Sequence, residues 1–197
     1  MVDTDAERVS RRALLTAAAA LAIASTEACA EQPTVKSGQS KILVAYFTRS
    51  GNTKVIAGTL QRTLGADIFE IRPAQAYPED YEQTVEQARQ ERDRGTEPPL
   101  ADRVPDIASY DEIYLGFPIW GETAPPIIRS FLSAHDLGGK TLRPFITHGG
   151  FGLGKSTEIL ARNAPAAKIA EPFVMEADQE RRTMTAVKGW LGEIKAV

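Results

Sequence analysis

Cysteine is almost absent from this sequence: it occurs once among 197 residues, as Cys29. An apolar run from Ala13 to Ala24 follows the pair Arg11-Arg12, and the small residues Ala28 and Ala30 flank the cysteine. This order is typical of a signal peptide. If a peptidase cuts after Ala30, the mature protein has no thiol, which excludes disulfides, thiol nucleophiles and cysteine-bound metals.

Long apolar runs and basic blocks are missing too. The apolar run near the N-terminus is too short to span a bilayer, so no stable membrane insertion is expected. The net charge is −3, and removal of residues 1–30, with three arginines and four acidic residues, leaves −2. Binding to nucleic acid through neutralised phosphates is therefore poorly supported.

Residues 1–30 are expected to direct export. The segment Ser10–Leu15 resembles the twin-arginine export motif. We therefore expect a periplasmic or secreted protein. Two alternatives stay open: lipid attachment at Cys29, and a chance arginine pair before an alanine-rich helix.

The rest of the chain alternates between strand-like and helix-like segments. Residues 31–40 are expected to be a flexible tether, and residues 41–197 one domain. Strands are expected at 41–48, 67–71, 112–117, 141–147 and 168–175. Helices are expected at 52–64, from 79 to about 94, from the Pro125-Pro126 pair, at 155–163 and at 178–195. Gly65 is expected to cap the C-terminus of the first of these helices. This alternation predicts an α/β fold, a doubly wound parallel sheet of five strands with helices on both faces.

Candidate binding residues lie in three loops after predicted strands, because ligands of open α/β sheets bind beyond the carboxyl ends of the strands. The first loop places hydroxyls, an amide and a glycine at the start of a helix, where free N–H groups and the helix dipole favour a phosphate. The candidates are Thr48, Arg49, Ser50, Gly51, Asn52 and Thr53 in the first loop, Pro118, Ile119, Trp120 and Gly121 in the second, and Thr147, His148, Gly149, Gly150 and Gly152 in the third.

The segment Tyr46–Thr53 resembles the FMN phosphate loop of the flavodoxin-like family. Leu115–Gly121 and Thr147–Gly150 resemble the two flavin-flanking loops of that family, and the resemblance extends from about Lys41 to the C-terminus. It implies strand order 2-1-3-4-5, FMN bound without a covalent bond, and electron transfer to a redox partner protein or a small acceptor such as a quinone. Where the family commonly has a second tryptophan, this chain has Gly121-Glu122, and Glu122 could lower the potential of the flavin.

Several loop residues have structural alternatives. Ser50 or Asn52 could simply cap the following helix, as serine and asparagine often do. Trp120 could anchor the core instead of lying near the flavin. His148 could complete the hydrogen bonds of its own loop rather than contact the ring.

Three aromatic residues lie outside the loops. Tyr77 and Tyr81 could cover a flavin, but packing against the polar helix that begins near residue 79 is favoured. His135 is expected at the surface near a helix end.

A competing pattern starts at Gly149. The segment Gly149–Ser156 fits the nucleoside-triphosphate P-loop, G-x-x-x-x-G-K-[ST], between a strand and a helix. No predicted strand ends in the aspartate that such an enzyme uses to bind its metal, so the flavin interpretation is favoured.

Three functions are compatible with this family resemblance. An electron carrier is favoured over an FMN-dependent NAD(P)H:quinone-type oxidoreductase, because no G-x-G-x-x-G fingerprint of a dinucleotide site follows a predicted strand. The third hypothesis is a cofactor-free interaction module of the same fold.

Overall fold

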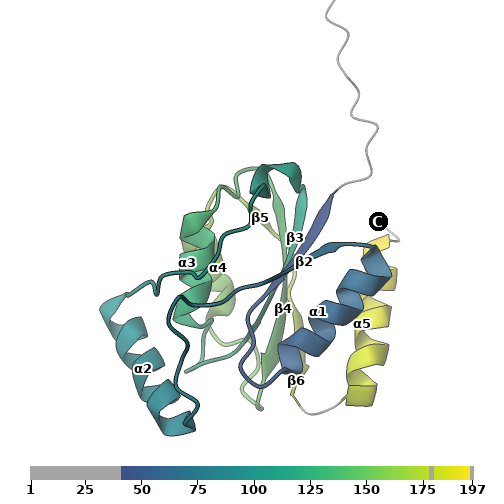
Figure 1. The fold of residues 1–197 in the computed structure, drawn as a ribbon. Helices are drawn as coiled ribbons and strands as arrows, with labels where there is room; N and C mark the ends of the chain where they lie inside the picture. The colour runs from purple at the N-terminus through teal and green to yellow at the C-terminus, as the bar shows by residue number, and fades with distance from the viewer. Residues whose placement is uncertain (1–40, 178–179, 196–197) are drawn as a thin grey trace, which may run out of the picture. The chain divides into compact units, whose positions relative to one another are not determined.

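The structure, a computed structural model, describes residues 41–177 and 180–195 (Figure 1). The signal peptide and the tether expected at 1–30 and 31–40 lie outside the described residues. In the described part of the chain, no helix is long and apolar enough to cross a membrane.

One sheet runs through the domain, and its strands pair in parallel. The order is β2-β1-β3-β4-β5, with β6 also paired to β4. The strands are β1 (Ile42–Tyr46), β2 (Asp67–Glu70), β3 (Glu112–Pro118), β4 (Thr141–His148), β5 (Lys168–Ile169) and β6 (Phe173–Glu176). The predicted α/β fold and the predicted order 2-1-3-4-5 are confirmed.

The last predicted strand differs from expectation. Residues 168–175 form not one strand but two short ones, β5 and β6, which pair with different stretches of β4. Pro172 lies in the gap between them. Because proline has no N–H group, it cannot donate to the strand ladder, and the pairing along β4 is interrupted.

In the described part of the chain, four α-helices lie between successive strands, a fifth follows β6, and a 3₁₀ helix spans Ile107–Ser109. Gly65 ends the first helix in the left-handed conformation, with φ 63°, as predicted. Asp80 caps the second, because its Oδ1 accepts a hydrogen bond from Gln83 N at 2.9 Å. The helices are α1 (Asn52–Leu64), α2 (Tyr81–Arg94), α3 (Pro126–Ala134), α4 (Ser156–Asn163) and α5 (Glu180–Lys195).

Two hydrophobic cores lie on the two faces of the sheet. Leu43 and Ala45 of β1 join the core beneath α3 and α4, whereas Val44 and Tyr46 face α1 and α5. This alternation follows from the two-residue period of a strand. Figure 1 shows α1 and α5 on one side of the sheet and α3 and α4 on the other, as the doubly wound fold requires.

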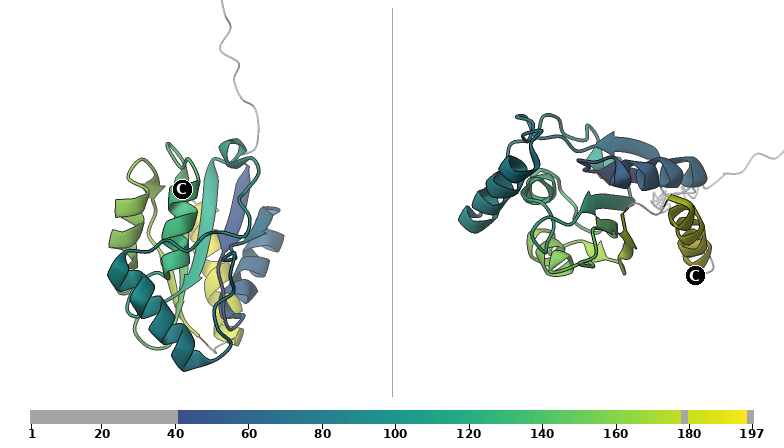
Figure 2. Two further views of the ribbon diagram at one scale, coloured as in Figure 1. Left: turned by 60° about the vertical axis from the view of Figure 1, so that its left-hand side comes forward. Right: turned by 90° about the horizontal axis from the view of Figure 1, so that it is seen from below.

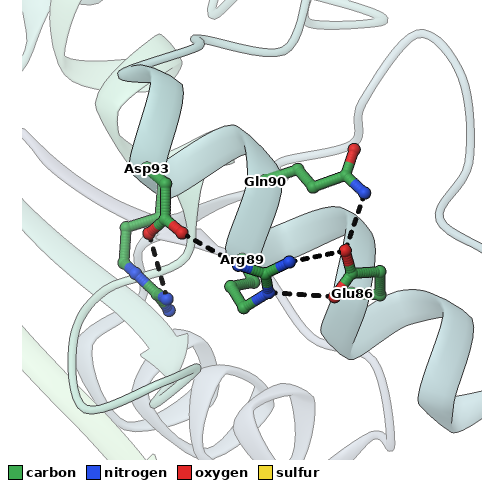
Figure 3. Close-up of polar contacts among 5 residues, drawn as sticks. Glu86, Arg89, Gln90 and Asp93 are labelled. Atoms are coloured by element: carbon green, nitrogen blue, oxygen red, sulfur yellow. Dashed lines mark hydrogen bonds and ion pairs between the residues drawn. The ribbon is translucent and has the colours of Figure 1, made fainter.

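Helix α2 stands apart from these layers, at the side of the domain (Figure 2). Only Thr84 and Ala88 of this helix are buried. Its exposed face carries an ion-pair network in which Arg89 binds Glu86 and Asp93 (Figure 3). Hydrogen bonding from Arg89 lowers the pKa of Glu86 to about 2, so this network stays charged through the physiological range.

The prediction for His135 is wrong, because this residue is buried. Its Nε2 accepts a hydrogen bond from Val104 N at 3.0 Å, and its Nδ1 lies 2.7 Å from the carbonyl oxygen of Phe131. This pairing requires the neutral ring with its proton on Nδ1. The position next to a helix end gave no sign that the distant Val104 segment would cover the ring.

Candidate functional site

The structure brings the three predicted loops together. They follow β1, β3 and β4, which are neighbours in the sheet, and the chain order reverses between β1 and β3. Main-chain bonds tie the loops to adjacent strands: Phe47 N donates to Gly116 O and Ile119 N to Thr147 O, both at 2.8 Å. All fifteen candidate residues therefore lie at the carboxyl edge of the sheet, where such folds bind ligands.

The first loop leaves the N-terminus of α1 without a side-chain cap. Gly51 precedes the helix with φ 93°, a conformation that favours glycine, and its N–H donates to Thr48 Oγ1 at 3.0 Å. Neither Ser50 nor Asn52 caps the helix, so that alternative is not supported. The first-turn N–H groups and the helix dipole are thus available for an anion.

Thr53 and Thr147 do not both keep their hydroxyls for a ligand. Their Oγ1 atoms lie 2.9 Å apart and are buried, so the two hydroxyls bond each other. This bond joins the first loop to the third. One of the two hydroxyl hydrogens is used in this bond, so the donors that remain are the other hydroxyl hydrogen and the main-chain N–H of Thr53.

Two basic side chains near the phosphate loop, Arg49 in the loop and Lys54 in α1, are held by other groups. Arg49 donates to the carbonyl oxygen of Glu79 at 2.7 Å and lies over the exposed ring of Tyr81. Lys54 Nζ lies 3.6 Å from a carboxylate oxygen of Glu70. Both side chains add positive charge near the phosphate loop, but their charged groups are already bound to Glu79 O and to Glu70.

The second loop turns sharply after Trp120. Trp120 N donates to Thr123 O at 2.9 Å, and the two residues between them have positive φ, 56° for Gly121 and 66° for Glu122. This is the backbone of a mirror-image tight turn, which a glycine adopts readily and a glutamate at a cost of about 1 kcal/mol. Glu122 is exposed at the edge of the site.

Trp120 packs into an aromatic cluster with Phe47 and Tyr77. The ring centroids lie 5.2 Å from Phe47 and 4.9 Å from Tyr77, and both contacts are edge-to-face. The hydroxyl of Tyr77 donates to Glu91 of α2 at 2.8 Å, and burial together with Glu91 raises its pKa. Tyr77 therefore packs against α2, as predicted, and holds the orientation of Trp120.

In the third loop, His148 completes the hydrogen bonds of its own segment. Its Nδ1 accepts from Gly150 N at 3.0 Å, so the alternative structural role is supported. The N–H group of the candidate residue Gly150 is already used in this bond. Phe151, between the positive-φ residues Gly150 and Gly152, is 77% exposed. Sequence reasoning missed this exposed ring at the rim of the site.

The second and third loops are fastened to each other. Glu122 O accepts a hydrogen bond from Lys155 N at 2.9 Å. A methyl group at Gly154 would come within 2.0 Å of the same oxygen, so only glycine permits this approach. Because Lys155 N is engaged here and Ser156 is fully buried, the P-loop interpretation is not favoured.

Two features of the site gave no local signal in the sequence. Glycine is required at position 154 by its contact with Glu122 O, and the guanidinium of Arg92 in α2 packs against Gly121. Both contacts join residues about thirty positions apart. Among the described residues, no cluster of histidine, cysteine or carboxylate side chains could hold a metal ion.

Comparison with known proteins adds a family and a set of structural neighbours. The family model for flavodoxin matches residues 41–194, whereas no curated protein sequence matches the chain. A candidate flavoprotein from Bacteroides eggerthii is 34% identical, with a TM-score of 0.70, over 81% of this chain and 99% of its own. A second, from Bacteroides uniformis, is 29% identical, with a TM-score of 0.68, over 77% of this chain and 99% of its own.

A more distant neighbour has the same fold and was solved with FMN bound. The flavoprotein from Lactobacillus acidophilus, solved in complex with FMN, is 19% identical to this chain, with a TM-score of 0.61. The match covers 75% of this chain and 99% of that protein.

Proposed function

Because this chain belongs to the flavodoxin family, we propose that it binds FMN without a covalent bond and transfers electrons outside the cytoplasm. The observation that supports FMN most directly is the uncapped N-terminus of α1, beside the point where the strand order reverses. When bound, FMN supplies the redox chemistry, and the protein contributes binding, orientation and electrostatics.

The phosphate would be held by the first loop. The donors are the N–H groups of Asn52 and Thr53 at the start of α1 and the hydroxyl of exposed Ser50. A methyl group built on Gly51 meets nothing within 4 Å, so the side of the loop at this glycine is open. The phosphate of FMN fits this set of donors because its oxygens accept hydrogen bonds from N–H and O–H groups.

The ring system of the flavin would lie against the second and third loops. Trp120 offers aromatic area whose orientation is set by Phe47 and Tyr77. Gly149 is exposed and has space for a close approach to its backbone. The fold shared with the FMN complex from Lactobacillus acidophilus is consistent with this arrangement.

An electron carrier fits the chain better than an enzyme with its own dinucleotide site. The fingerprint of such a site is missing from the sequence, so a nicotinamide donor would have to bind transiently over the flavin. The partner we propose is a redox protein or a small acceptor such as a quinone. With a net charge of −2 after removal of residues 1–30, long-range electrostatic steering toward that partner is weak.

The test is binding of FMN and of riboflavin, which lacks the phosphate, to the full chain. We expect Ser50→Glu, which adds a negative charge at the phosphate loop, to weaken FMN binding at least about tenfold while changing riboflavin binding little. The matched control is Thr63→Glu, at an exposed position in the last turn of α1. Fluorescence titration gives both dissociation constants.

Two results would change the proposal. A wild-type chain that binds neither flavin would overturn it and favour the cofactor-free interaction module. Anaerobic titration with dithionite then separates the redox roles: addition of electrons in two separate steps supports the carrier. Addition of both electrons together, with turnover of NAD(P)H and a quinone, would replace the carrier with an oxidoreductase.

A further inference from the structure

Arg92 lies in the last turn of α2, and its guanidinium packs against the turn of the second loop. A methyl group at Gly121 would come within 2.2 Å of Nη1 of Arg92. The side chain is 36% exposed, so it lies at the boundary between the site and solvent. The structure thus places a permanent positive charge beside a loop that borders the crevice of the sheet.

The charge of Arg92 belongs to a row of alternating signs along α2. Its Nη2 lies 3.2 Å from Asp93, the same carboxylate lies 3.3 Å from Arg89, and Arg89 also binds Glu86 at 2.8 Å (Figure 3). The row ends at Arg92. Arg92 is the member of this network that contacts the second loop. Because Coulomb interactions fall with distance, its positive charge acts on this loop more strongly than the other charges of the network do.

We propose that Arg92 stabilises the negative charge that a flavin at this loop gains on reduction, and so favours binding of reduced over oxidised FMN. The inference rests on the proposed FMN function. The second loop follows β3, which pairs with both β1 and β4, so a ligand that extends from the first loop toward the third passes it. A cation beside this path favours the more negative form of the ligand.

Glu122 provides the opposite charge on the same turn. Its side chain is exposed, and its backbone φ of 66° keeps it at the tip of the turn. If Arg92 acts through its charge, Glu122 acts in the opposite direction. Glu122→Gln should therefore favour reduced FMN, whereas Arg92→Gln should disfavour it.

The experiment measures the ratio of the dissociation constants for reduced and oxidised FMN in the full chain. Fluorescence gives the oxidised constant, and the shift in midpoint potential of bound relative to free FMN gives the ratio. We expect Arg92→Gln to shift this ratio about three- to tenfold against reduced FMN at low salt, and less at high salt. Arg92→Lys, which keeps the charge, and Arg94→Gln, which removes an exposed charge from the same helix, should leave it near the wild-type value.

The possible results separate this inference from the proposed function. If the wild type binds FMN but Arg92→Gln leaves the ratio unchanged, the inference is wrong and the proposed function stands. Equal shifts in Arg92→Lys and Arg92→Gln would point to packing against Gly121 and would also overturn it. If the wild type binds no FMN, the proposed function fails and this inference fails with it.

Discussion

The two histidines of this protein differ in chemistry because their neighbours differ. His148 accepts a hydrogen bond from Gly150 at the partly exposed end of β4. His135 lies between the Val104 N–H and the Phe131 carbonyl, and only 8% of its surface is exposed. Burial lowers the pKa of His135, with a smaller contribution from Arg103. His148 thus supports the structure of its own loop, whereas His135 is a buried, neutral ring that joins two segments of the chain.

His135 makes stability depend on pH. In the unfolded chain its pKa returns to about 6.5, whereas the folded protein holds it lower. Above about 6.5 both states are neutral and the contribution of His135 is fully present. As the pH falls toward the folded pKa, the unfolded state takes up the proton first, so the free energy of unfolding decreases. We expect urea unfolding at pH 7.5 and 5.5 to show this decrease.

Replacing each histidine in turn shows whether the His135 ring causes this dependence of stability on pH. His135→Gln should lower the free energy of unfolding at pH 7.5 by about 1–2 kcal/mol, because a buried donor and acceptor lose their partner. It should also reduce the loss between pH 7.5 and 5.5. His148→Gln should keep the wild-type loss. Equal pH dependence in wild type and His135→Gln would show that another group is responsible.

At the scale of helices and strands, local signals determined what could be predicted. The glycine after α1 and the apolar run of β1 are read directly from neighbouring residues, and both predictions are confirmed. Pro172 was visible in the sequence, but its effect depends on the pairing of β5 and β6 with β4. Local signals therefore predicted the α/β fold, and the family resemblance supplied the strand order. The break in the last strand was not predicted.

The site was predictable in position but not in its contacts. The three loops could be identified because each follows a strand and has a distinctive composition. The pairing of Thr53 with Thr147 and the packing of Arg92 on Gly121 join distant segments. No spacing rule within one element reports such contacts, because they depend on how whole elements pack.

Glycines in two elements should respond in opposite ways to replacement by alanine. Gly189 lies within α5, and a methyl group there meets nothing within 4 Å. Gly189→Ala should raise the free energy of unfolding by about 0.5–1 kcal/mol, because alanine restricts the unfolded chain and favours the helix. Gly116 lies in β3 under the ring of Phe145, where a methyl group would come within 2.1 Å of ring atoms.

Gly116→Ala should therefore destabilise the protein by about 1–3 kcal/mol through overpacking. Urea denaturation of both variants and of the wild type measures the two effects. The double variant Gly116→Ala/Phe145→Leu removes the ring and should recover part of the loss. A Gly116→Ala protein as stable as the wild type would show that Phe145 is not fixed over the strand.

At the scale of the whole molecule, the candidate site does not exist before the sheet forms. Its three loops come from positions near 50, 120 and 150, and parallel strands bring their ends together only after helical crossovers have formed. The proposed FMN site therefore forms only in a chain that has folded through β4. If the cofactor is loaded in the cytoplasm, export has to act on a folded protein, which is what the twin-arginine route is known for.

The order of folding, loading and export gives the last prediction. Replacing Arg11-Arg12 with two lysines should keep the protein in the cytoplasm, and the retained chain should contain FMN because its fold is complete. Arg8→Lys, which changes a nearby basic residue outside the pair, should be exported normally. Cell fractionation, with flavin fluorescence of each purified fraction, measures both outcomes. Retained protein without flavin, alongside exported protein with flavin, would mean that loading follows export and would contradict this order.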